Sequence, residues 1–186
     1  MRIPHLFAAL AVAALAAWPS GAAIMPMTLK ELMGITHDSI HGEIVNSKTV
    51  VMDRPYAGAI HTELTIEGTS LRTGEKVKET VVFFGSHTEG PRGFMSEQPD
   101  LADVRVGRES VFFISNETKP STHKRLHHWG AVFRVERGFG EPVVVGKGEG
   151  MAFGTTLKLT EARVRVRDTH LELQAEAAAK QIPGLK

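Results

Sequence analysis

The segments SIHGEIV, residues 39–45, and IHTELTI, residues 60–66, largely alternate between apolar or small side chains and polar ones. A period of two is typical of a β-strand with one face buried and the other in water. The first run continues to Met52, after an irregularity near Asn46 that indicates a β-bulge. We therefore expect the fold to begin with two long strands.

Shorter runs of β-branched and aromatic residues follow at residues 77–84, 110–115, 131–136 and 143–146, separated by glycine, proline and polar residues. Many short strands spaced by turn residues indicate an antiparallel barrel or sandwich. The aromatic side chains fall within these runs, where burial is the ordinary explanation. We expect a core that includes Ile40, Ile44, Leu64, Ile66, Val82, Phe112, Ile114, Val132 and Val135.

The chain outside the strands predicts two helices. Residues 27–34 place apolar side chains on one helical face behind Thr28, a residue type that caps helices. Residues 169–182 begin with a threonine and carry Glu172 three positions later, which is the spacing of a capping box. Just before them, arginine and valine alternate over residues 163–167, which predicts an edge strand with basic side chains facing outward.

The composition favours one domain with no nucleic-acid partner. The chain has 186 residues, 22 Lys+Arg, 21 Asp+Glu, nine His and no Cys. Such a length is ordinary for a single domain, and a net charge of +1 gives no electrostatic footprint for phosphates. The lack of cysteine excludes disulfides, thiolate metal ligands and a lipid on an N-terminal cysteine.

The N-terminus reads as an export signal. Arg2 precedes an unbroken apolar run at residues 6–18, and small residues follow at residues 20–23. A retained membrane anchor would need about 20 apolar residues, and the run ends too early for that. We expect a signal peptide over residues 1–23, one β-barrel domain over residues 24–186, and release to the periplasm or outside the cell without a remaining membrane span.

Several elements together carry a resemblance to a known group of proteins. They are a helix and first strand with Asp38, Ile40, Gly42 and Ile44, then residues 62–67, a turn at residues 106–109 into residues 111–114, and residues 130–135 leading to residues 143–146. Over residues 28–150 the chain resembles secreted bacterial proteins of uncharacterised function that are similar to netrin-like modules and tissue inhibitors of metalloproteinases.

The resemblance implies a small antiparallel barrel of five or six strands, related to the OB-fold, with helices packed at its ends. Inhibitors of that family act through an N-terminal cysteine that chelates the protease zinc. Because this chain has no cysteine, inhibition by that mechanism is not implied.

Histidines offer the clearest candidate for a metal site. His123, His127 and His128 lie within six residues, and one of His37, His41 or His61 could join them to bind zinc or copper. No carboxylate within residues 123–129 completes a local ligand set, so the alternative is an exposed polar loop that happens to carry histidines. His37, Asp38 and His41 also suggest a pair for proton transfer, but no nucleophile or third group accompanies them.

Two long polar connections, residues 86–103 and 116–129, are the candidate recognition loops. The first contains Arg92 and the apolar pair Phe94 and Met95, which either packs back on the barrel or binds a partner.

No sequence motif identifies a catalytic residue. Neither a nucleophile elbow nor a phosphate-binding loop is present, and the glycine-rich residues 146–150 predict a turn. We therefore expect an exported, non-catalytic binding or interaction module, whose partner is a protein or small molecule of the cell envelope or the exterior. The alternative is a histidine-based protein that binds a transition metal, or an enzyme that depends on one.

Overall fold

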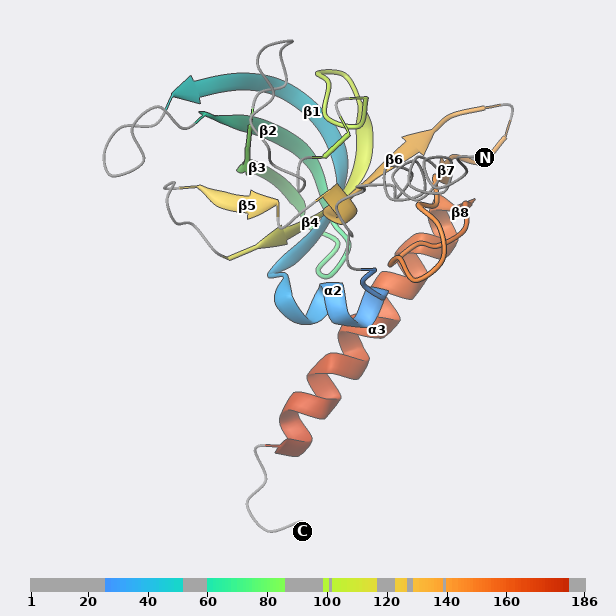
Figure 1. Cartoon of the computed structure of the whole chain (residues 1–186). Helices are drawn as coiled ribbons and strands as arrows, with labels where there is room; N and C mark the ends of the chain where they lie inside the picture. The colour runs from blue at the N-terminus through green and yellow to red at the C-terminus, as the bar shows by residue number, and fades with distance from the viewer. Residues whose placement is uncertain are drawn as a thin grey trace, which may run out of the picture.

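Five strands form a closed barrel in the computed structural model (Figure 1). The structure describes residues 26–51, 60–85, 99–100, 102–116, 123–126, 129–138 and 140–180. The barrel strands are β1 (Asp38–Val51), β2 (Ile60–Ser70), β3 (Lys76–Phe84), β4 (Glu109–Ser115) and β5 (Lys124–Leu126). Their order is β1-β2-β3-β5-β4, and β4 pairs back with β1 to close the barrel. The predicted small, mainly β barrel is confirmed.

The remaining elements build a layer on one side of the barrel. They are α2 (Leu29–Ile35), the short 3₁₀ helix η1 (Trp129–Ala131), β6 (Val132–Glu136), β7 (Val143–Val144), β8 (Leu157–Lys158) and α3 (Leu159–Lys180). Strand β6 pairs with β4 beside β5, and β7 and β8 extend the sheet from β6. In Figure 1, α2 and α3 lie beside one another, and α3 continues well past the barrel. Among the described residues, no helix has the length and apolar character needed to cross a membrane.

The long strands follow the predicted pattern. The β1–β2 register shifts between Ile44 and Asn46, which confirms the expected bulge. The N-terminal helix also forms as predicted, because Thr28 accepts from the Glu31 amide and the Glu31 side chain accepts from the Thr28 amide. Strands β5 and β8 were not expected, since two or three residues are too few to show a period.

Two glycines allow β1 and β2 to approach closely. Gly42 and Gly68 are paired across the two strands. A Cβ atom built on Gly68 would lie 2.3 Å from the carbonyl oxygen of His41, and one on Gly42 would lie 2.6 Å from that of Glu67. Glycine at these points lets the sheet bend into a barrel.

The fold has two hydrophobic cores that share β4. The barrel interior holds Ile40, Ile44, Leu64, Ile66, Val81, Phe83, Val104, Phe112, Ile114, Leu126 and Val132. A second core lies between the outer wall of β4 and β6 and the two helices, and includes Leu32, Met33, Val111, Phe113, Phe133, Val135, Phe153, Ala162 and Val166. All nine residues predicted to form the core are buried.

The predicted edge strand at residues 163–167 is wrong. This segment lies inside α3, which begins ten residues earlier than the predicted helix. Leu159, Ala162 and Val166 are buried at helical spacing, whereas Val164 is exposed. The buried side chains therefore follow the helical period of 3.6 residues and not the period of two that the alternation of arginine and valine suggests. An ion pair between Glu161 and Arg165 one helical turn apart further favours the helix.

Candidate functional site

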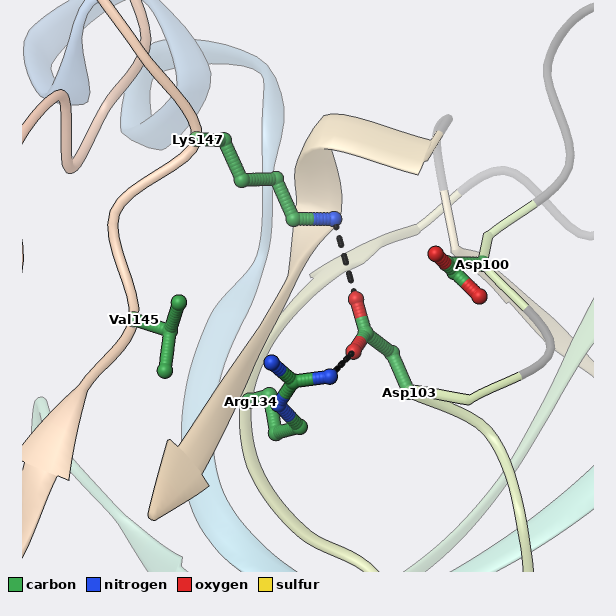
Figure 2. Close-up of a pocket in the computed structure, with 5 residues that line it drawn as sticks. All are labelled: Asp100, Asp103, Arg134, Val145 and Lys147. Atoms are coloured by element: carbon green, nitrogen blue, oxygen red, sulfur yellow. Dashed lines mark ion pairs between the residues drawn. The ribbon is translucent and has the colours of Figure 1, made fainter.

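A cavity of about 220 Å³ opens among five residues, Asp100, Asp103, Arg134, Val145 and Lys147, and is called the mouth pocket below. Figure 2 shows Asp103 between the ends of Lys147 and Arg134, with Val145 and Asp100 on either side. Its residues come from the segment before β4, from β6 and from the turn after β7.

Two of the pocket residues lie close in sequence to residues of the barrel interior. Arg134 lies two residues beyond Val132 on β6, so it continues the strand face that lines the interior core. Asp103 precedes Val104, which packs into the same core. Both pocket residues are therefore anchored next to rigid, buried neighbours.

Lys147 reaches the pocket from the turn after β7. Its backbone N–H donates to the Phe153 carbonyl at 2.9 Å, and the Gly148 N–H donates to the Gly154 carbonyl at 3.0 Å. Gly148 has a φ of 102°, a conformation that favours glycine. The turn predicted at residues 146–150 is present, and its backbone holds the lysine in place.

The ion pairs inside the pocket are long. The distances are 3.3 Å from Lys147 Nζ to Asp103 Oδ2 and 3.6 Å from Arg134 Nη1 to Asp103 Oδ1. Direct charge-assisted hydrogen bonds are usually about 2.7–2.9 Å. The side chains of Asp103 and Lys147 are only 8% and 11% exposed, so both charges are largely removed from water.

Burial lowers the pKa of Lys147, while the charges of Asp103 and Asp100 act in the opposite direction. The Lys147 ammonium also lies 5.6 Å from the ring centre of Phe133. A negatively charged group in the pocket would further compensate the ammonium for its lost hydration.

A second cluster lies on the outer side of β2, β3 and β5 and consists of His61, Glu63, Phe84, Arg125 and, just before β5, His123. We call it the β2–β3–β5 face. His61 pairs with Phe84 in the β2–β3 register, and the Arg125 guanidinium lies 4.8 Å from the ring centre of Phe84. Glu63 Oε1 is 3.2 Å from His61 Nε2 and 4.0 Å from His123 Nε2. His61 is buried, and its Nδ1 has no hydrogen-bond partner among the described residues.

Of the residues predicted to bind a metal or a partner, only some lie within the described part of the chain. His123 lies near His61, as one of the suggested combinations requires, whereas His37 precedes β1 and His41 belongs to another cluster. Within the described ranges, no three His, Cys, Asp or Glu residues are grouped so that they could hold a metal ion. The other predicted site residues lie outside the described residues: Arg92, Phe94, Met95, His127 and His128.

His41 connects the barrel with α3. Its Nε2 lies 2.7 Å from Glu109 Oε1, and its Nδ1 lies 3.0 Å from Arg163 Nη2. Since arginine only donates, Nδ1 accepts and the proton resides on Nε2. Burial is the main cause that lowers the pKa of His41, opposed by Glu109. Asp38, suggested by sequence as a carboxylate partner for histidine, instead accepts from the Ser39 N–H and the Ser70 hydroxyl.

The residues of the mouth pocket were not singled out by the sequence. Asp100, Asp103, Arg134 and Lys147 come from three separate segments and belong to no motif. One feature of the sequence could have indicated the pocket: Lys147 lies between two glycines, which is typical of a tight turn that carries a long charged side chain.

Comparisons of this chain with family models, curated proteins and solved structures found no match. A fold of this kind hosts many functions, so function must be argued from the site.

Proposed function

We propose that this protein is an exported, non-catalytic binding module that holds a small charged molecule in the mouth pocket. The observation that carries the proposal is the convergence of buried Asp103, the half-buried Lys147 and Arg134 on a cavity. A few charged side chains that converge on a cavity are typical of a small-molecule site.

Other features agree with this proposal. The signal-like residues 1–23 favour a role in the periplasm or outside the cell. The balanced charge of the chain disfavours nucleic acid as the partner. The ion pair of Lys147 with Asp103 opposes the effect of burial, which lowers the pKa of Lys147, and so favours the ammonium form that a binding site for a charged molecule uses.

The proposal is tested by NMR titration of the isotope-labelled protein, purified after export, with small organic acids, amines and amino acids. We expect at least one of these compounds to shift, saturably, the amides of residues 102–104, 134 and 145–147. Lys147→Met should weaken that binding at least tenfold, and Lys158→Met, a change at an exposed lysine outside the pocket, should leave it unchanged. If no compound shifts these amides, or if Lys147→Met binds as well as the unmodified protein, the proposal is wrong.

A second candidate function, binding of zinc or copper, is favoured by one observation on the β2–β3–β5 face. His61 and His123 both face the Glu63 carboxylate, and imidazole and carboxylate are ordinary zinc ligands. The distance of 4.0 Å from His123 Nε2 to Glu63 Oε1 means that a metal would have to draw these groups together, or recruit His127 or His128. A metal-dependent enzyme would also require an open coordination position.

Metal analysis of protein purified without an affinity tag tests this second candidate. Stoichiometric zinc or copper that is lost in His61→Ala and His123→Ala, but kept in the control His37→Ala, would support it. A stable protein free of both metals after incubation with each would exclude it.

A further inference from the structure

The C-terminal helix α3 continues well past the layer that anchors it (Figure 1). Val166 is its last buried residue, and 14 more residues follow in the helix, a length of about 21 Å at 1.5 Å per residue. Lys30 of α2 holds this part in place, because its Nζ lies 2.7 Å from Glu172 Oε1 and 2.6 Å from Glu176 Oε1. The helix is thus fixed on the body of the protein while much of its surface is exposed.

An apolar stripe runs along the exposed side of α3 and is called the α3 stripe below. Its members are Val164, Leu171, Ala175 and Ala178. A period of 3.6 residues puts them opposite the buried side chains of the helix, and Val164 and Leu171 are 45% and 55% exposed. Their spacing of seven, four and three residues is that of a helix that packs along a second helix.

The charges beside the α3 stripe change sign along the helix. Arginines occupy positions 163, 165 and 167, and the carboxylates Asp168, Glu172 and Glu176 follow them. Arg165 pairs with Glu161 one turn earlier, yet its side chain is still 52% exposed, and that of Glu172 beside Lys30 is 55% exposed. A guanidinium has five donors and a carboxylate accepts several hydrogen bonds, so both groups can make a further contact.

We propose that the α3 stripe binds the same stripe of a second copy of this protein, with the two helices antiparallel. When Val164 is level with Ala175 of the second copy, residues 163–167 lie alongside residues 172–176 of that copy. The basic part of each helix then meets the acidic part of the other. In a parallel pair, Asp168 would meet Asp168 of the second copy and arginines would meet arginines, so the charges select the antiparallel direction.

The size of the α3 stripe sets the strength of the dimer. Two of its four residues are alanines, so the contact is smaller than the roughly 1,200–2,000 Å² that stable complexes bury, and the dimer is weak. We expect a dissociation constant of about 0.1–1 mM. The α3 stripe shares no residue with the mouth pocket, so this inference is independent of the proposed function.

Sedimentation equilibrium of the protein purified after export tests the association. We expect a monomer at about 10 µM and a reversible dimer whose share grows toward about 1 mM. Leu171→Gln, which keeps a good helix former, should raise the dissociation constant at least tenfold. The control Val106→Gln, at an apolar residue outside α3 that is 59% exposed, should leave it unchanged. A protein that stays monomeric, or a dimer that Leu171→Gln does not weaken, would overturn the inference.

Disulfide cross-linking tests the direction, because the chain has no cysteine of its own. Under mild oxidation at high concentration, a mixture of Val164→Cys and Ala175→Cys should form a disulfide dimer that contains one copy of each. Either variant alone should form none, since its two cysteines would lie 11 residues apart along the pair, about 16 Å, and a disulfide needs Cα atoms within about 7 Å. Val106→Cys mixed with either variant is the control for random contact. Disulfide dimers formed as readily by each variant alone would show a parallel pair and would contradict the inference.

Discussion

At the scale of single residues, His41 makes the stability of the fold depend on pH. Burial lowers the pKa of His41 in the folded protein below the value of about 6.5 that the unfolded chain has. The unfolded chain therefore binds more protons in this range, and the free energy of unfolding falls as the pH drops below 6.5 and through the lower folded pKa. Above about pH 6.5 the full contribution is present.

The variant His41→Gln tests this dependence, because an amide can donate to Glu109 and accept from Arg163 without titrating. Denaturant unfolding at pH 7.5 and pH 5.5 should show a smaller loss of stability on acidification in the variant than in the unmodified protein. The control His37→Gln, at an exposed position before β1, should keep the full loss. An equal loss in His41→Gln would contradict the assignment.

Phe112 is the residue whose truncation should cost the most in the barrel interior. It is fully buried, and Phe112→Ala should lower the free energy of unfolding by about 3–5 kcal/mol, through lost burial and a residual cavity. Val106→Ala, at a residue that is 59% exposed, should change it by less than about 0.5 kcal/mol. Chemical denaturation measures both, and a loss under about 1 kcal/mol for Phe112→Ala would contradict its place in the core.

At the scale of elements, the β1–β2 crossing depends on the absence of a side chain. Gly68→Ala would place its Cβ against the His41 carbonyl, and we expect this overpacking to cost about 1–3 kcal/mol of stability. Gly34→Ala is the matched control, since nothing lies within 4 Å of its Cβ position in α2, and it should stabilise the fold by about 0.5–1 kcal/mol through helix propensity. Opposite signs in thermal or denaturant unfolding are the expected result; equal effects would show that the close approach is relaxed in solution.

The sequence predicted an element correctly where the element is long or is stabilised by residues close to it in the chain. β1 and β2 show a clear period over many residues, and α2 carries its own cap. Strand β5 has three residues and exists because β3 and β4 offer it partners from distant parts of the chain. At residues 163–167 a local alternation suggested a strand. A helix forms there instead, because one face of α3 covers the second core.

The mouth pocket could not be predicted for a related reason. Asp103 and Lys147 are 44 positions apart and meet only after β6 and β7 have been added to the barrel. His61 lies on β2 and His123 just before β5, so this pair is likewise far apart in the chain, and the sequence offered His61 only as one of three options. Short motifs reveal sites built from neighbouring residues, and these sites combine residues from distant segments.

At the scale of the whole molecule, the expectation of export gives a direct test. The protein recovered from the exported fraction should begin at Ala23 or Ile24, because small residues precede these positions and follow the apolar run. N-terminal sequencing or intact mass measures this. A chain that keeps Met1, or that needs detergent to stay in solution, would contradict both cleavage and the proposed place of action.

Strand β4 faces the barrel interior with Phe112 and Ile114 and the helical layer with Val111 and Phe113. Neither core can lose its packing without uncovering one side of this strand, so the two layers should open together as one cooperative unit. The β4 amides would then exchange with deuterium only through global unfolding, whereas the end of α3, beyond its last buried residue Val166, should exchange earlier by local fraying. A ligand bound in the mouth pocket would contact Arg134, which pairs with Ser110 of β4, and would slow the exchange of both layers at once.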